Sequence, residues 1–248
     1  IEDDLLYVHV TSFDQKVVQG VKDALKEHSD AKGLILDLRN NPGGLLDQAV
    51  GLVDLFVDEG VIVSQKGKLK SENLEYRATK EETNKDLPLV VLINGGSASA
   101  SEIVSGALQD FNRTIVIGEK TFGKGSVQVV MPIGADEALK LTVARYYLPS
   151  GRTIQAVGVT PDITIPLGKI DFAEDTVMLK EKDLKKHLES ELAKIDTETK
   201  KSTKKNEENN ATKEDEKIIT EEQIFKDLQL KRAVDILKAL IITNKGKV

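Results

Sequence analysis

Short apolar runs alternate with amphipathic segments along the chain from Leu5 to about Pro166. The runs are rich in Val, Ile and Leu and have the length of strands, and the segments between the early runs carry apolar residues at helical spacing. Strands that alternate with helices form βαβ units, so the pattern predicts an α/β fold with a largely parallel sheet. The predicted strands are 5–10, 33–38, 61–65, 89–93, 114–117, 127–131 and 139–147.

Three helices are predicted among these strands. Asp14 is placed to cap the first, whose apolar face ends at Leu25. The second covers 46–57 and the third covers 99–109. The stretch 66–86 is polar and charged, which favours a surface excursion between two strands.

After Asp171 the chain changes character. Residues 177–192 have the pattern of a charged amphipathic helix, and 197–217 are almost entirely polar, as in a solvated linker. An apolar stripe returns from Glu221 to Ile242, and it needs a partner, either the main domain or a second copy of the chain. We predict a core over 1–170, a charged helix over 171–195, a linker over 196–218 and a C-terminal helix over 219–248.

The scarcity of metal-binding residue types narrows the chemistry. The 248 residues include no cysteine, which removes thiol nucleophiles, disulfides and cysteine-bound metals. The three histidines, His9, His28 and His187, lack metal-ligand spacing and are typical of packing or surface positions. A net charge of −6 argues against nucleic acid as the main partner. We expect neither a metal nor a cofactor.

The segment 90–102 runs from a buried strand through Gly95-Gly96 into a helix and carries three alternating serines. A serine at the start of this helix would face backbone N–H groups that have no partner within the helix, and these stabilise negative charge. Ser99 with Glu102 also matches a capping box, which is the structural alternative. The local pattern leaves the choice among Ser97, Ser99 and Ser101 open.

Two further segments combine glycines with chemically useful residues. The Asn-Asn-Pro-Gly-Gly turn at 40–44 follows a strand, and its glycines let a backbone N–H approach a ligand, although ordinary turns use the same residues. Lys124 is bracketed by glycines and followed by an apolar strand, so its amine is expected to enter a pocket. Burial would favour the neutral form that a general base requires. A phosphate-binding loop is disfavoured because the surrounding pattern does not match.

These three segments resemble the carboxy-terminal processing proteases, also called tail-specific proteases. The matching stretches are Asp-Leu-Arg-Asn-Asn-Pro-Gly-Gly at 37–44, Gly-Ser-Ala-Ser-Ala-Ser-Glu at 96–102 and Gly-Glu-Lys-Thr-Phe-Gly-Lys-Gly-Ser-Val-Gln at 118–128. The stretches 141–152 and 158–162 also match. The resemblance covers about Leu5 to Pro166 and implies a core similar to the ClpP/crotonase fold, with a helical C-terminal extension.

The resemblance implies a role for each matching residue. The middle serine, Ser99, would be the nucleophile, and Lys124, which lies 25 residues later, would be the general base. Gln128 would orient the amine of Lys124. The backbone N–H groups of two further residues would form the oxyanion hole, namely Gly44 and Ala100, with Gly43 as an alternative to Gly44.

The activity implied is that of an ATP-independent serine endopeptidase, which would cleave proteins near their C-termini through an acyl-enzyme. It would act in the bacterial cell envelope, in the periplasm or another extracytoplasmic compartment. The helical ends of relatives often join subunits, so the stripe from Glu221 to Ile242 is a candidate homo-oligomer contact. Relatives also carry a peptide-binding PDZ domain before the first matched strand, and its absence here leads us to expect a fragment.

Two alternatives remain at this stage. A crotonase-type enzyme acting on acyl-CoA would share the fold and the oxyanion hole, but it would need neither Ser99 nor Lys124. A noncatalytic scaffold could retain the fold alone, although the presence of Ser99, Lys124 and Gln128 together argues against it.

Overall fold

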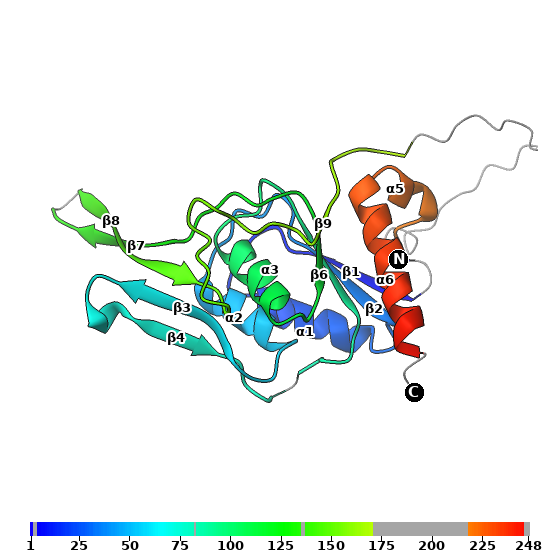
Figure 1. The fold of residues 1–248 in the computed structure, drawn as a ribbon, viewed down its shortest axis with the longest axis horizontal. Helices are drawn as coiled ribbons and strands as arrows, with labels where there is room; N and C mark the ends of the chain where they lie inside the picture. The colour runs from blue at the N-terminus through cyan, green and yellow to red at the C-terminus, as the bar shows by residue number, and fades with distance from the viewer. Residues whose placement is uncertain (2–3, 82, 135–136, 171–217, 246–248) are drawn as a thin grey trace, which may run out of the picture. The chain divides into compact units, whose positions relative to one another are not determined.

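The computed structural model describes residues 1, 4–81, 83–134, 137–170 and 218–245. Its central sheet has five parallel strands in the order β1-β2-β5-β6-β9 (Figure 1). Strands β2 and β5 are buried at every residue, as expected for parallel strands that are covered on both faces. The predicted α/β fold with a parallel sheet is confirmed. The strands of this sheet are β1 (Leu5–His9), β2 (Gly33–Asp37), β5 (Leu89–Ile93), β6 (Ile115–Gly118) and β9 (Ile163–Thr164).

Each face of the central sheet has its own hydrophobic core. Leu34 and Leu36 of β2 pack with helices α1, α2 and α3, whereas Ile35 packs with α5 and α6. The division follows from the alternation of side chains along a strand. The helices are α1 (Val17–Glu27), α2 (Leu46–Asp54), α3 (Ala100–Asp110), α5 (Glu221–Phe225) and α6 (Leu228–Lys245).

Four strands form a second, antiparallel sheet in the order β4-β3-β8-β7. The sequence predicts three of these strands but not their separation from the parallel sheet. Strands β7 and β8 follow each other without a helix between them, so they pair as a hairpin. The predicted surface excursion at 66–86 contains a fourth strand, which is paired with β3. The bounds are β3 (Val61–Gly67), β4 (Leu74–Arg77), β7 (Ser126–Pro132) and β8 (Ala138–Tyr147), with a 3-10 turn at Lys70–Glu72.

The prediction that Asp14 caps helix α1 is wrong, because the helix begins later in the chain. Lys16 is the N-cap residue, and the Asp14 carboxylate accepts the backbone N–H of Lys16 at 2.8 Å. Asp14 therefore stabilises the turn that precedes the helix. The difference arises because this side chain bonds to an N–H two residues ahead, as in an Asx-turn.

Helix α6 buries its apolar stripe against the chain's own parallel sheet. Of the two partners that the sequence leaves open, the main domain is the one found, so a homo-oligomer contact would need another face of the helix. No helix within the described ranges is long and apolar enough to cross a membrane. The predicted helix at 177–192 and linker at 197–217 lie outside the described residues. The buried stripe consists of Leu230, Ala233, Val234 and Leu237, which share a core with Leu5, Ile35, Val90, Leu92 and Ile117.

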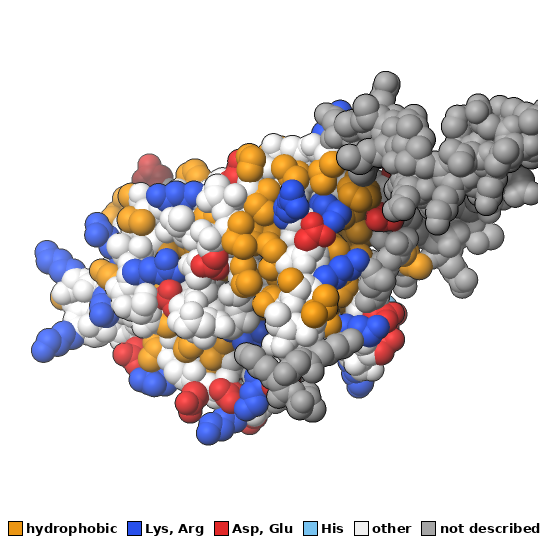
Figure 2. Space-filling view, turned by 45° about the vertical axis from the view of Figure 1, so that its right-hand side comes forward, with side chains coloured by type: hydrophobic (Ala, Val, Ile, Leu, Met, Phe, Trp, Pro, Cys, Tyr) orange, Lys and Arg blue, Asp and Glu red, His pale blue; other side chains and the backbone are white. Residues whose placement is uncertain are grey.

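The surface carries both signs of charge. Figure 2 shows Lys and Arg side chains interspersed with Asp and Glu side chains on the face turned toward the viewer, with hydrophobic side chains between them. The net charge of −6 is therefore not gathered on this face as one acidic surface. Exposed apolar side chains also occur on the β7–β8 hairpin, at Val130, Met131 and Ile133.

The packing of α6 predicts how two substitutions in this helix differ. Leu237 is fully buried, and a Cβ added at Gly33 would lie 2.9 Å from Leu237 Cδ1. We expect Leu237→Ala to lower the free energy of unfolding by about 2 to 5 kcal/mol, because it leaves a cavity in a packed core. Ile242 is 70% exposed, so Ile242→Ala is the matched control, with an expected loss below about 0.5 kcal/mol. Urea unfolding measures both, and equal losses would show that α6 does not pack on the sheet.

Candidate active site

Ser99 lies where strand β5 gives way to helix α3. The strand ends at Ile93, a turn follows, and Ser99 is the N-cap residue of a helix that begins at Ala100. The Ser99 backbone has φ 57° and ψ −111°, a conformation that residues with a side chain rarely adopt. Strain of this kind persists only where the surroundings impose it, and it is typical of functional positions, including nucleophilic serines on strand-to-helix turns.

The three alternating serines occupy different environments. Ser97 is fully buried, where its Oγ donates to Leu38 O at 2.8 Å and accepts the N–H of Asn94 at 3.0 Å. Ser101 is also fully buried, and its Oγ donates to Asn41 O at 2.9 Å. Ser99 is partly exposed. Of the three hydroxyl groups, that of Ser99 is the one open to a reactant.

The Asn-Pro-Gly-Gly turn lies directly against Ser99. A Cβ on Gly43 would lie 2.8 Å from Ser99 Cβ and 2.9 Å from the backbone nitrogen of Ala100, so only glycine fits there. Gly43 also has φ 98°, which glycine adopts without strain. Asn41, which is fully buried, binds the turn to the serine segment because its carbonyl oxygen accepts the N–H of Ala98 at 2.9 Å.

Two backbone N–H groups, one next to Ser99 and one in the turn that packs against it, have no acceptor in the part of the chain that the structure describes. One belongs to Ala100, at the first position of α3, where an N–H has no partner within the helix. The other belongs to Gly44. The N–H of Gly43, the alternative, already donates to Asn41 Oδ1 at 2.8 Å. The geometry therefore favours Gly44 with Ala100 as the pair of donors for an oxyanion.

Glu102 joins the segment of Ser99 to the segment of Lys124. The Glu102 carboxylate is fully buried, and its Oε2 accepts the N–H of Ser99 at 2.9 Å and the N–H of Lys124 at 2.8 Å. Its Oε1 accepts the hydroxyl of Thr121 at 2.6 Å and the N–H of Gly123 at 2.7 Å. Four donors face the group, which suits the ionised carboxylate and places Ser99 and Lys124 around one oxygen atom.

Sequence reasoning assigns Glu102 only a capping role and misses Thr121 and Asn94. Thr121 Oγ1 also accepts the N–H of Val159 at 2.7 Å, so it ties the lysine loop to a later part of the chain. Asn94 exchanges hydrogen bonds with Asn40 across the two turns, at 2.9 Å each. One sequence feature could have identified these three residues. Each lies inside an apolar or glycine-rich segment, where a polar side chain requires hydrogen-bond partners.

The structure brings the backbone of Lys124 to the site but leaves its side chain exposed. The burial expected from the flanking glycines is therefore not found. The glycines instead allow close backbone contacts, because a Cβ on Gly125 would lie 2.7 Å from Gln155 N. Gly123 has φ 92°, which a residue with a side chain rarely adopts.

Gln128 lies on strand β7 with its side chain exposed. The pairing of β7 with β8 shifts in register between Val127 and Gln128. Among the described residues, the side chains of Ser99, Lys124 and Gln128 form no hydrogen bond with one another. The structure thus assembles Ser99, Gly44, Ala100 and the Lys124 backbone, while the Lys124 amine and the Gln128 amide remain apart from the serine hydroxyl.

The two described histidines are not joined to this site. His9 ends strand β1 and is exposed, and His28 is the C-cap residue of α1 and is also exposed. His187 lies outside the described residues. Neither His9 nor His28 forms a hydrogen bond with Ser99 in the described structure, so the geometry gives neither of them the position of its base.

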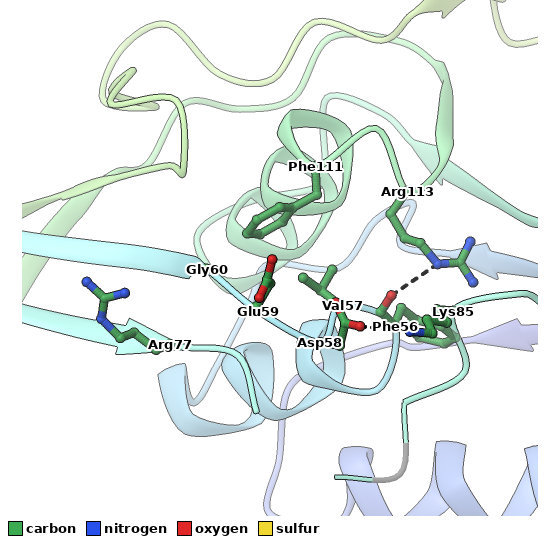
Figure 3. A pocket seen from close by; sticks show the side chains of 9 residues that line it. All are labelled: Phe56, Val57, Asp58, Glu59, Gly60, Arg77, Lys85, Phe111 and Arg113. Carbon is green, nitrogen blue, oxygen red and sulfur yellow. Dashed lines mark hydrogen bonds and ion pairs between the residues drawn. The ribbon is translucent and has the colours of Figure 1, made fainter. Parts of the chain in front are cut away.

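A separate cavity of about 610 Å³ lies at the start of strand β3 (Figure 3). Its lining includes none of the candidate site residues. Several of its charged groups bind other lining residues: Arg113 Nε donates to Phe56 O at 3.1 Å, and Lys85 pairs with Asp58 at 2.9 Å. Because this cavity contains none of the candidate site residues, the candidate active site remains the Ser99 region.

The bonds to Glu102 predict a large effect of Glu102→Gln. An amide offers one oxygen where four donors now converge, so its NH₂ group would face donors on one side. We expect the free energy of unfolding to fall by about 3 kcal/mol and the reactivity of Ser99 to fall with it. Glu222→Gln is the control, since that exposed carboxylate pairs with exposed Lys226 on the same helical turn. Urea unfolding and fluorophosphonate labelling test this, and equal behaviour of the two variants would contradict the role of Glu102.

A strained, accessible serine at a helix N-terminus, with two unengaged amides beside it, is the arrangement of a serine hydrolase. The chain belongs to peptidase family S41, whose model matches residues 4–165. That assignment confirms the resemblance deduced from the three segments.

The similar proteins include a carboxy-terminal-processing protease of Bartonella bacilliformis, 44% identical over 196 residues, which cover 76% of this chain and 45% of the relative. A probable CtpA-like serine protease of Staphylococcus aureus is 42% identical over 166 residues, covering 65% of this chain and 33% of the relative. Among solved structures, the photosystem II D1 C-terminal processing protease matches with a TM-score of 0.61 and 38% identity, covering 65% of this chain and 42% of that chain. The chain spans less than half of each of these relatives.

Proposed function

We propose that this chain cleaves peptide bonds in proteins as a serine endopeptidase, with Ser99 as nucleophile and Lys124 as general base. The observation that carries the proposal is the strained backbone of Ser99 together with two unengaged N–H groups, that of Ala100 next to it and that of Gly44 in the turn whose Gly43 packs against Ser99. Glu102 also holds the backbone of Lys124 close to that of Ser99, because one of its oxygens accepts the N–H groups of both residues. This combination supports Ser99 as a nucleophile with an oxyanion hole, and the backbone of the proposed base is held to the same carboxylate as the Ser99 backbone.

In the proposed reaction, neutral Lys124 takes the hydroxyl proton of Ser99 as Oγ attacks the scissile carbonyl carbon. The oxyanion accepts hydrogen bonds from Gly44 and Ala100. Collapse breaks the C–N bond, and the leaving amine takes the proton from Lys124. Water then gives a proton to Lys124 and attacks the acyl ester, and collapse returns a proton to Ser99 Oγ as the new carboxyl group departs. No cofactor is required by these steps.

Because the Lys124 side chain is exposed in the free protein, the proposal requires the substrate to shield it from water. A polypeptide lying across Ser99 covers the lysine side chain and removes water from its amine, which favours the neutral form. Gln128, which lies four residues later, carries an amide that can accept a hydrogen bond from the amine without adding charge. Both side chains would adopt their working positions when the substrate binds, since catalytic hydrogen bonds often tighten only in the bound complex.

An extended peptide has a ready place beside this site. Strand β7 begins two residues after Lys124 and is the last strand of its sheet, so one of its edges is unpaired within the described residues. Extended peptides bind such edges through backbone hydrogen bonds. We propose polypeptide substrates on this ground. Cleavage near their C-termini is proposed from the named carboxy-terminal-processing relative, and action in the bacterial cell envelope is proposed from the family resemblance of the three sequence segments.

An enzyme acting on acyl-CoA would also use the N–H groups of Gly44 and Ala100 as an oxyanion hole. It would not require the strained Ser99, nor the Glu102 carboxylate that bonds to the backbones of Ser99 and Lys124. A noncatalytic scaffold would gain nothing from holding Ser99 at φ 57°, a conformation that costs about 1 to 3 kcal/mol. Neither alternative accounts for the observations as a peptidase does.

A fluorophosphonate probe tests the proposal on the intact chain. Attack by Ser99 forms the oxygen–phosphorus bond, breaks the phosphorus–fluorine bond and transfers the serine proton to Lys124. We expect one adduct per chain, which peptide mapping assigns to Ser99. An acyl-CoA enzyme or a scaffold would remain unlabelled, and an adduct on Ser97 or Ser101 would overturn the assignment.

A further inference from the structure

Arg39 occupies the junction between strand β2 and the turn that carries Gly44. Its Nε and Nη2 atoms donate to Asp37 Oδ2, at the end of the strand, at 3.0 and 2.6 Å. Tyr7 donates its hydroxyl to the same oxygen at 2.8 Å. The Arg39 side chain is only 12% exposed. The guanidinium is therefore nearly buried and hydrogen-bonded, and it lies next to the turn that faces Ser99.

The other side of the guanidinium is bound by the C-terminal segment, residues 218–245. Nη1 of Arg39 lies 2.7 Å from Asp227 Oδ2 and donates to Gln229 Oε1 at 3.1 Å. Gln229 is fully buried, and its Nε2 donates to Ile165 O at 2.8 Å. This segment lies outside residues 4–165, which the family model matches.

These groups depend on one another. Burial disfavours the Arg39 cation, but hydrogen bonds and ion pairs with Asp37 and Asp227 outweigh this effect and hold the pKa of Arg39 above its ordinary value. Arg39 is therefore charged at every working pH, and the loss of Asp227 would leave a nearly buried cation short of a partner. Such a cation must move or draw water inward.

Any movement of Arg39 acts directly on the oxyanion turn. Asn40, the next residue, has φ 57° and donates its N–H to Asn94 Oδ1 at 2.9 Å. Asn41 follows, and its Nδ2 donates to Val10 O at 2.6 Å. Asn41 also holds the N–H of Gly43. The turn is thus held by a short series of specific bonds that begins at Arg39 and ends at Gly43, the residue before Gly44.

We infer that the C-terminal segment sets the oxyanion turn for catalysis through Arg39, with Asp227 and Gln229 as positioning residues. The inference rests on the proposed function of Ser99 and Gly44. It assigns to residues 218–245 a role in the reaction, beyond their role in covering the sheet, although none of their side chains reaches Ser99 in the described structure.

The test uses Asp227→Asn in the intact chain. Asp227 Oδ1 also accepts the N–H of Leu230 at 3.0 Å at the start of α6, and asparagine can keep this cap while it removes the charge. Gln229→Leu removes both side-chain bonds of Gln229 at similar size. The control is Asp235→Asn, on the same helix, where the carboxylate pairs with Lys231 and Arg232 at the surface.

Two measurements are made on each variant at a temperature well below its thermal midpoint. The first is the fluorophosphonate reaction, resolved into its maximal rate and its half-saturating concentration. We expect the maximal rate to fall about ten-fold in Asp227→Asn and Gln229→Leu, with half-saturation changed less than about two-fold, as for a transition-state effect. The second is amide hydrogen exchange of the peptide that spans the turn, which we expect to become about ten-fold faster, with the peptides of α6 unchanged.

The outcomes separate this inference from the proposed function. Unlabelled wild-type chain would overturn the proposed function, and with it the part of the inference that concerns catalysis. Labelling of wild type at Ser99 with unchanged maximal rates in both variants would overturn the inference alone. Faster exchange in α6 as well as in the turn would also overturn it, because the variants would then have loosened the helix generally. Asp235→Asn is expected to match wild type in both measurements.

Discussion

Ser99→Ala is expected to abolish proteolysis and fluorophosphonate labelling, with a loss of about 10⁴-fold or more. The substitution removes the Oγ that forms the acyl-enzyme in the proposed reaction. Alanine suffers the same backbone strain as serine at φ 57°, so the free energy of unfolding should change by less than about 1 kcal/mol. Peptide cleavage and urea unfolding measure the two effects.

The neighbouring serines provide the control, because their replacement should lower stability but leave the reaction with the probe intact. Ser97→Ala removes one of the two bonds to the carbonyl of Leu38 and leaves the N–H of Asn94 without its partner, so it should cost about 1 to 3 kcal/mol of stability. Ser101→Ala removes a buried bond to Asn41 O. Both variants should still react with the probe below their unfolding temperatures. Residual cleavage by Ser99→Ala, or its loss in Ser97→Ala while that variant is folded, would contradict the assignment of the nucleophile.

Lys124→Arg is expected to lower cleavage by about 10² to 10⁴-fold, nearly as much as Lys124→Ala. Arginine retains the positive charge but stays protonated at any pH that the protein survives, so it cannot accept the Ser99 proton. The bond between the backbone N–H of residue 124 and Glu102 is independent of the side chain, so the loop should keep its position. The measurement is kcat on a peptide substrate, with the loss expected in kcat.

The matched control is Lys120→Arg, in the same loop. Lys120 is exposed and precedes the three loop residues that donate to Glu102, so its replacement should leave kcat unchanged. If Lys124→Arg retained more than about a tenth of the wild-type rate, the lysine would serve as a positive charge near the serine, and the base would have to be sought elsewhere. Unchanged thermal unfolding of both variants would show that a loss of kcat arises in the reaction and not from unfolding.

The outline of the fold was predictable because it depends on local pattern. Short uninterrupted apolar runs such as Leu89–Ile93 are typical of strands that are covered on both faces, and the structure buries that strand completely. The start of α3 was predictable for the same reason, since a turn with two glycines followed by Ser99 and Glu102 marks a helix N-terminus. The second sheet was not predictable, because β3 pairs with β8, which lies far along the chain.

The sequence by itself determined the strand-and-helix order, the position of Ser99 at a helix start and the motifs that match one peptidase family. The tertiary structure decided which serine is accessible, why the N–H of Gly44 and not that of Gly43 is open, and which partner the α6 stripe covers. The tertiary structure also revealed Glu102 as the link between Ser99 and Lys124. The physical reason is that strand and helix patterns arise from neighbouring residues, whereas burial and hydrogen-bond saturation depend on residues that only folding brings together.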